Sequence, residues 1–492
     1  MTHERFCDIL KSDYLKLLPI LVLAAYIALI PHMDYPYPVH LDEWSHMAEA
    51  KRMMVLGDVN VAHELWRPLM ADETPFFEVG FHLFTGIFQN VSGLSWVTIT
   101  RYLPLVIFAL TVLSAYIFGK RNGFGWEAAL MTCLVPTTVG ILGPGLLVPV
   151  ALGLPLILLS IYLSFNFRTI WSYIVVFLFM SFLLSMHPVT AAGLAILLAP
   201  YILVNLRVDL RHGLCLAFSL GIPFVPVPVL FGIKKIAREI DVFAHDPASA
   251  YTAWPELIHD YGYIGTSLCL IGIFLLFIKG GWERNGLIYG FLLLLLILVT
   301  YIQFHFGLSI LYSRGLLYIM LIMGIFAGCG LAGMRRLTLP HRLVAGVIPV
   351  FLRNSFGSVL CLTFVVATLI IAIPMRQDTY YYHMIDEVDY QTFVWIRDHL
   401  DESYNKAILD PWKATAFAAV TGRSVRSRIV AYPDLPVQED QAFLDDGCVD
   451  TNYLRKRRVS IIYTRDLKCN NPDLVGTENP YVYLLENKGS GN

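Results

Sequence analysis

The chain has 492 residues, of which 56% are hydrophobic and only 15% are charged, and its formal net charge is -2. Its mean hydropathy is +0.60. A soluble protein cannot bury so much apolar surface, so the composition predicts a polytopic α-helical membrane protein. The nearly balanced charge, with no basic cluster that resembles a nucleic-acid footprint, argues against a nucleic-acid partner.

Long apolar segments predict about eleven membrane spans, because roughly 20 apolar residues are needed to cross a bilayer. The predicted spans are Leu15–Met33, Arg101–Gly119, Trp126–Ile141, Leu147–Phe165, Ile170–Met186, Val189–Leu206, Gly213–Gly232, Gly262–Lys279, Gly286–Phe304, Gly315–Gly333 and Phe356–Pro374. We interpret the first as a retained signal-anchor with a cytosolic N-terminus. Nearly all short loops rich in lysine and arginine then lie on the cytosolic side, in agreement with the positive-inside rule.

This topology makes residues 34–100 a long outer loop with an unusual charged stretch, from His40 to Met54. A helix starting at Asp42 would carry Asp42, His46 and Glu49 on one face. Charged groups beside a membrane need a task or a partner. Asp42 can be the N-cap of this helix, a functional carboxylate, or both. These three residues could hold a metal ion, but no histidine pair in the loop has a recognised metal-site spacing, so no metal is expected.

A second feature of this loop is the apolar run Phe76–Ser92, which we predict to be a juxtamembrane or half-inserted helix. A further crossing here would turn every later basic loop outward. Glu78 and His82 are four residues apart on this run, and therefore share one face of a helix. The alternative is an ordinary interfacial amphipathic helix with polar ends.

Other cationic groups are predicted on the outer side. Arg101 begins the second span, Tyr312 and Arg314 precede a late span, and the loop 233–261 contains Lys234, Lys235 and Arg238. Each has an alternative role, because arginines at span ends often snorkel to the interface and basic loops contact lipid headgroups.

From Met375 onward the composition is that of a soluble domain. The predicted helices are Asp389–Leu400, Ala414–Val420 and Glu439–Lys456, and the predicted strands are Lys406–Leu409, Val425–Val430, Val459–Tyr463 and Tyr481–Leu485. Alternation of helices and strands predicts a small α/β domain over 375–492, after a membrane domain over 1–374. An extracytosolic position would allow Cys448 and Cys469 to form a disulfide.

Short motifs in the loops and the tail resemble the GT-C class of integral membrane glycosyltransferases. They begin with the acidic pair in Leu41-Asp42-Glu43-Trp44 and include the stretches 72–82, 101–104, 312–317, 409–411 and 421–425. The resemblance implies a donor sugar on a polyprenyl-phosphate carrier, an acceptor that is a glycan, a lipid or a protein, and Asp42 as general base. Residues 128–208 contain no acidic residue and the chain has no Trp-Trp-Asp motif. Both departures argue against an oligosaccharyltransferase and against a required metal or other cofactor.

The expected chemistry is inverting transfer of a hexosyl or pentosyl group in the cell envelope. A carboxylate can accept the proton of an attacking hydroxyl, and the departing phosphate needs cations instead of an acid. Asp42 is therefore the predicted base, with Glu43 as its helper. The predicted substrate-binding residues are Arg101, Arg314, Tyr312, Glu78, His82, His46 and Lys234.

Two other functional classes remain open from the sequence. A transporter or flippase of lipid-linked glycans would carry ionisable residues within its spans, whereas here polar groups gather outside them. A non-catalytic membrane receptor with an α/β tail is the other alternative.

Overall fold

The computed structural model describes residues 13–59, 78–231, 233–234, 236–237, 254–304, 306–338, 350–429, 435–465 and 467–485. The chain forms two compact units. One, the membrane unit, comprises Met1–Asp34 and Arg101–Tyr381. The other, the loop–tail unit, comprises Tyr35–Thr100 and Tyr382–Asn492.

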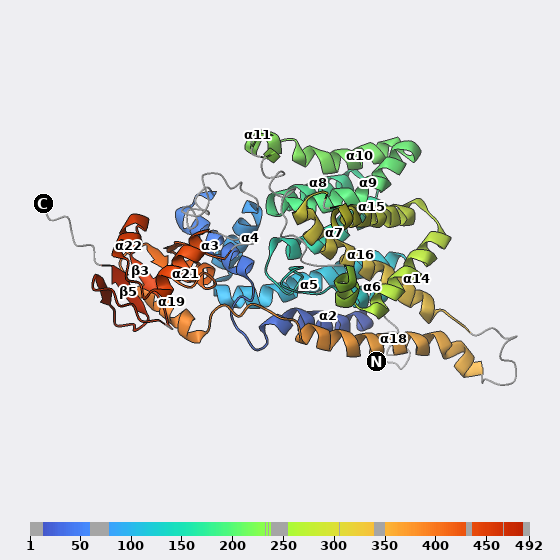
Figure 1. The fold of residues 1–492 in the computed structure, drawn as a ribbon. Helices are drawn as coiled ribbons and strands as arrows, with labels where there is room; N and C mark the ends of the chain where they lie inside the picture. Colours follow the sequence, from blue (N-terminus) through green and yellow to red (C-terminus); the bar gives the residue numbers. More distant parts are fainter. Residues whose placement is uncertain are drawn as a thin grey trace. The chain divides into compact units, whose positions relative to one another are not determined.

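The membrane unit is a bundle of apolar helices (Figure 1). Its longer helices are α2 (Asp13–Leu29), α5 (Trp96–Arg121), α7 (Pro149–Asn166), α8 (Ile170–Met186), α9 (Pro188–Val208), α10 (Leu210–Gly221), α14 (Tyr263–Lys279), α15 (Trp282–Phe304), α16 (Ser309–Arg335) and α18 (Val350–Gln377). Short helices are η1 (Ile30–His32), α6 (Gly125–Thr132), η3 (Ile222–Phe224), α11 (Val227–Phe231) and α13 (Trp254–Tyr261). Within the described residues, eight stretches are long and apolar enough to cross a membrane, and α8 and α14 are shorter apolar helices. The predicted class, a multi-pass helical membrane protein, is confirmed.

Helix α16 forms the centre of this bundle, since the most apolar 18-residue window of its stretch Leu311–Arg335 is entirely buried. It packs against α14, α6, α18 and α15. The approach to α14 depends on glycine: a Cβ on Gly272 would lie 1.8 Å from the carbonyl oxygen of Phe326, and one on Gly330 would lie 2.1 Å from that of Leu268. Small residues let membrane helices come this close.

The predicted span Trp126–Ile141 is wrong as a continuous helix. Only Gly125–Thr132 is helical, and the chain then runs through buried turns to α7. Pro136 and the glycine-rich stretch that follows interrupt the helix, because proline cannot donate its backbone hydrogen bond. The segment satisfies polar groups internally, as when the Gly145 amide donates to Thr137 Oγ1 at 2.7 Å. Irregular backbone is tolerated at membrane depth only where protein covers it.

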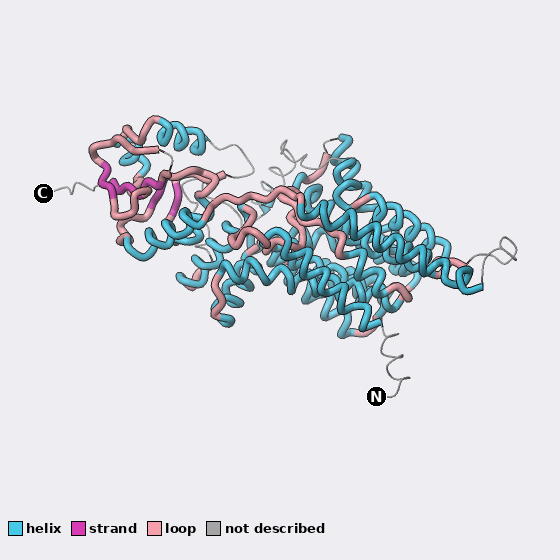
Figure 2. Tube along the Cα trace, turned by 90° about the horizontal axis from the view of Figure 1, so that it is seen from below, coloured by secondary structure: helices cyan, strands magenta, loops and turns pink. Residues whose placement is uncertain are grey.

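The loop–tail unit contains a five-stranded sheet, shown as the group of magenta segments in Figure 2. Its order is β2-β1-β3-β5-β4, with β1 (Lys406–Ile408), β2 (Ser424–Val425), β3 (Ile461–Tyr463), β4 (Leu474–Gly476) and β5 (Val482–Leu485). β1 pairs in parallel with β2 and β3, and β5 is antiparallel to β3 and β4. The helices are α3 (Leu41–Leu56), α4 (Val79–Ser92), α19 (Glu387–His399), α20 (Ala414–Thr421), α21 (Leu435–Asp445) and α22 (Thr451–Arg457). The predicted mixed α/β tail is confirmed.

Details of the tail differ from the prediction. The expected helix Glu439–Lys456 is two helices, because Gly447 and Cys448 have φ angles of 76° and 62° between them, and Asp450 caps α22. Such left-handed backbone ends a helix. β2 is shorter than the strand predicted over 425–430, of which residue 430 lies outside the described residues, and β4 was not predicted.

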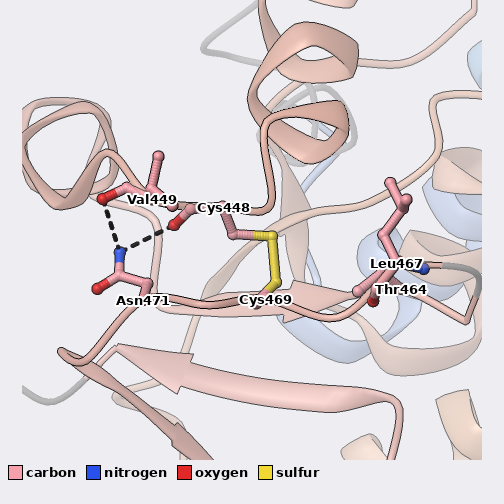
Figure 3. Close-up of a disulfide and its surroundings, with 6 residues drawn as sticks. All are labelled: Cys448, Val449, Thr464, Leu467, Cys469 and Asn471. Carbon is pink, nitrogen blue, oxygen red and sulfur yellow. Dashed lines mark hydrogen bonds between the residues drawn. A yellow bond between two sulfur atoms is a disulfide. The ribbon is translucent and has the colours of Figure 1, made fainter.

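A disulfide joins Cys448 to Cys469 at the turn between α21 and α22 (Figure 3). The side-chain amide of Asn471 donates to the carbonyl oxygens of Cys448, at 2.8 Å, and Val449, at 3.3 Å. Cys448 is fully buried in a cluster with Ile462 from the sheet. The pairing that the sequence allowed but left open is therefore present.

The first loop and the tail are joined by hydrogen bonds and by helix packing. The Tyr35 hydroxyl donates to the Ile385 carbonyl at 2.7 Å, and the Tyr37 hydroxyl donates to Glu387 Oε2 at 2.5 Å. Helix α3 packs directly on α20. The loop that carries Asp42 is consequently an integral part of the α/β unit.

Candidate active site

The start of α3 holds the acidic pair, and its N-cap is His40. Nδ1 of His40 accepts a hydrogen bond from the backbone amide of Asp42 at 3.1 Å. The alternative role of Asp42 as N-cap is therefore wrong, because another side chain performs that task. The Asp42 side chain is 39% exposed, and its Oδ2 lies 3.9 Å from Nδ1 of His40.

Glu43 differs from its neighbour in both burial and bonding. It is only 1% exposed, and its Oε2 accepts a hydrogen bond from the Val39 backbone amide at 3.0 Å. This bond satisfies a backbone donor at the start of the helix, as acids in a first turn commonly do. Of the two carboxylates, Asp42 is the one with substantial access to a substrate.

One turn beyond Asp42, His46 meets two residues of α4. Its Nδ1 lies 3.0 Å from Nε2 of His82 and 3.8 Å from Oε2 of Glu78. Nδ1 of His82 in turn lies 3.5 Å from Oε2 of Glu49. The three ligand atoms of His46, Glu78 and His82 lie within 4.8 Å of one another, a spacing that could hold a metal ion. The residues foreseen as separate substrate ligands are thus in mutual contact.

Arg428, which the sequence analysis missed, lies beside this group. It is 7% exposed, and its Nη1 donates to Ser45 Oγ on α3 at 3.4 Å. Burial lowers the pKa of the Arg428 guanidinium to about 10, while the charges of Glu49 and Asp42 oppose this shift. At neutral pH the guanidinium is still positive, and a cation close to a carboxylate favours its ionised form. No sequence pattern links Arg428 to α3.

The pH dependence of stability tests the packing of α3 on α20, because Lys51 of α3 is partly buried at this contact. Its Nζ donates to the Ala419 carbonyl at 2.7 Å, and burial, aided by repulsion from Arg397, lowers its pKa from 10.5 to about 8. The folded state therefore releases this proton at a lower pH than the unfolded state does. As the pH rises from about 8 to 10.5, we expect the stability of the wild type to rise relative to that of a Lys51→Met variant. Urea unfolding of both proteins across this range measures their free energies of unfolding. A difference between the two proteins that does not change with pH would contradict the lowered pKa of Lys51.

The other predicted ligands lie in the membrane unit. On α5, the Arg101 guanidinium lies 5.4 Å from the centre of the Tyr102 ring. On α16, Tyr312 is 2% exposed and stacks on Tyr301, with ring centres 5.0 Å apart. Arg314, two residues further along, is partly buried.

Lys234, also predicted as a ligand, is exposed. Lys235 and Arg238 lie outside the described residues. Because Asp42 belongs to the other unit, its grouping with Arg101 and Arg314 stays a prediction.

No protein-family model and no curated protein sequence matches the chain. Among solved structures, the archaeal oligosaccharyltransferase AglB from Archaeoglobus fulgidus, in complex with an inhibitory peptide and a dolichol-phosphate, is similar with a TM-score of 0.57 and 12% identity, over 92% of this chain and 70% of that chain. ArnT from Cupriavidus metallidurans, bound to undecaprenyl phosphate, is similar with a TM-score of 0.54 and 15% identity, over 96% of this chain and 97% of that chain. Likeness at such low identity concerns the fold, over nearly the whole chain. The chain therefore has the fold of the GT-C class of integral membrane glycosyltransferases.

Proposed function

We propose that the chain is a membrane glycosyltransferase that moves a hexosyl or pentosyl group from a polyprenyl-phosphate carrier to an acceptor hydroxyl of a glycan, lipid or protein. The observation that carries the proposal is the exposed Asp42 carboxylate at the start of α3. The backbone amide of Asp42 donates a hydrogen bond to His40, and the buried Arg428 cation lies nearby. The fold adds support, since solved proteins that share it hold dolichol-phosphate and undecaprenyl phosphate.

In the proposed reaction the acceptor oxygen attacks the anomeric carbon from the face opposite the phosphate. The bond from that carbon to the phosphate oxygen breaks, the hydroxyl proton passes to Asp42, and the phosphate leaves as an anion on its lipid. Displacement from the opposite face inverts the anomeric centre. The leaving group is already a stable anion, so a carboxylate base and cationic phosphate ligands suffice.

The proposed phosphate ligands are Arg101, Arg314 and Lys234, with Tyr312 as a hydrogen-bond donor. Guanidinium groups suit this task because they can bind two phosphate oxygens at once. Glu43 is a weaker candidate for the base than Asp42, since its carboxylate accepts a backbone hydrogen bond in a buried position.

We propose that the reaction takes place on the extracytosolic side, with the N-terminus in the cytosol. The disulfide between Cys448 and Cys469 supports this orientation for the loop–tail unit, because disulfides persist in oxidising compartments and are rare in the cytosol. Asp42 belongs to that same unit. Membrane lipids surround the apolar helices of the other unit.

Incubation of the purified protein with a panel of polyprenyl-phosphate sugars and a membrane extract that supplies acceptor hydroxyls tests the proposed function. We expect one donor to be consumed, with release of polyprenyl phosphate. If vesicles containing the protein move a lipid-linked glycan across the bilayer without cleaving it, the flippase alternative is correct and the proposal is wrong. If well-folded protein neither consumes nor moves any donor, the result favours the non-catalytic receptor.

Replacement of Arg428 by glutamine tests its influence on the base. Loss of the buried cation leaves Asp42 and Glu49 without its positive charge, which disfavours the carboxylate form. We expect the acid limb of the kcat/KM profile to move to higher pH, by about one pH unit, and Arg428→Lys to restore it in part. Arg426→Gln is the matched control, because Arg426 is also buried but pairs with Glu439. An unchanged acid limb in Arg428→Gln would contradict the assigned role.

A further inference from the structure

The group His46, Glu78 and His82 has the chemistry of a transition-metal site. Two imidazole nitrogens and one carboxylate oxygen converge, with separations of 3.0 Å between the histidines and 3.8 Å between His46 and Glu78. Ligand atoms about 2.0–2.1 Å from a tetrahedral zinc ion lie roughly 3.3 Å apart, a value between those two distances. All three atoms lie within 4.8 Å of one another, so side-chain adjustments that close the wider separations would place them around one ion.

A second observation also points to a bound metal ion. Glu49 Oε2 lies 3.5 Å from Nδ1 of His82, on the far side of that ring from His46. Histidines that bind metals usually donate their other ring nitrogen to a carboxylate, which fixes the tautomer and leaves the free lone pair facing the ion. Here Nδ1 of His82 faces the Glu49 carboxylate, and Nε2 of the same ring faces His46. His82 and Glu49 are 2% and 8% exposed, so this pair is held within the packed interior.

The site is open on one side. The side chains of His46 and Glu78 are 13% and 27% exposed, compared with 2% for His82. Three protein ligands with one accessible position are typical of zinc sites that also accept water or another ligand. Two imidazoles favour zinc and neighbouring transition metals over Mg²⁺ or Ca²⁺, which prefer oxygen ligands.

We propose that His46, Glu78 and His82 bind one zinc-class divalent ion that fastens α4 to α3, with Glu49 as the outer carboxylate that orients His82. The ion connects the N-terminus of α4, where Glu78 is the N-cap with a φ of 77°, to the helix that begins with Asp42. A non-glycine residue in this left-handed region is strained, and coordination of its side chain would compensate part of that strain. The proposal departs from the sequence-based expectation of no metal, and it does not depend on sugar transfer.

Zinc binding to the full-length protein tests the site without an activity assay. After removal of metals with a chelator, the wild type is titrated with Zn²⁺ against a competing chelator, and with Co²⁺ while its visible absorption is recorded. We expect one equivalent to bind, a Co²⁺ spectrum typical of four- or five-coordination with nitrogen ligands, and little competition from excess Mg²⁺. Bound zinc should also raise the melting temperature, because a ligand stabilises the state that binds it.

Variants identify the ligands. Glu49→Gln should weaken zinc binding by about 10- to 100-fold, and His46→Ala or His82→Ala should weaken it further and abolish the Co²⁺ bands. His399→Ala is the matched control, since His399 is an exposed histidine of α19 in the same unit and its loss should change nothing. Glu78→Gln, at the more exposed edge of the site, provides a variant with little risk to folding and should also weaken binding. Absence of stoichiometric binding by the wild type, or equal binding by wild type and Glu78→Gln, would overturn the proposal.

Discussion

Asp42→Asn is expected to reduce sugar transfer by about 10²- to 10⁴-fold, the usual contribution of a general base, while the protein remains folded. Asparagine cannot accept the proton of the attacking hydroxyl. It keeps the backbone amide that His40 caps, and the side chain it replaces is substantially exposed. Turnover at saturating donor, compared with the melting temperature of the same preparation, measures both parts of the prediction.

The control for this variant is Asp58→Asn, which removes an exposed carboxylate just beyond the other end of α3. It changes the net charge by the same amount, so any general electrostatic effect on an anionic donor would appear in both variants. Full transfer activity in Asp42→Asn would refute the role of this residue as base. A joint loss of activity and melting temperature would assign it a structural role.

Removal of the disulfide by Cys448→Ala and Cys469→Ala together should destabilise the tail by about 3 kcal/mol. The bond closes a loop with a sequence separation of 21, and the entropy that a loop of this size loses in the unfolded chain corresponds to about that value. Hydrogen exchange of peptides from β3 and β5 reports the local opening free energy directly. We expect their protection to fall by about two orders of magnitude, because 1.4 kcal/mol corresponds to a factor of ten.

Cys215→Ala is the matched control, because this cysteine is a free thiol in α10 of the membrane unit. Its replacement should leave the exchange of β3 and β5 unchanged. Equal protection in the wild type and the double variant would mean that the two sulfurs are not joined in the folded protein. That result would also remove the support that the disulfide gives to an extracytosolic tail.

The spans and the tail could be predicted because their signals are local. Stretches such as Pro188–Val208 are apolar for the length of a bilayer crossing, and Lys406–Ile408 is a short apolar run between polar turns. The prediction failed over residues 133–141, because hydropathy reports burial and does not distinguish a helix from irregular backbone that protein covers. Gly447 and Cys448 interrupt a helix through their backbone angles, and only the glycine signals this in the sequence.

Several residues of the candidate site stood out in the sequence, but their contacts with one another did not. Asp42, His46 and His82 stood out because charge and imidazole are unexpected near an apolar segment. That Glu78 and His82 meet His46 depends on the packing of α4 on α3, which no pattern within either helix specifies. Arg428 is separated from Ser45 by 383 positions, and a single sequence carries no signal for such a contact.

The packing of the first loop against the tail has a consequence for biosynthesis. Tyr35 bonds to a carbonyl 350 positions later, and α3 leaves the ribosome long before its partner α20 has been translated. Until then the helix with the proposed base has an uncovered face, and a nascent chain that stops before residue 382 never covers it. We therefore expect premature termination after residue 377 and before residue 414 to yield an inactive protein, even though α18, the last described membrane helix, has already been made.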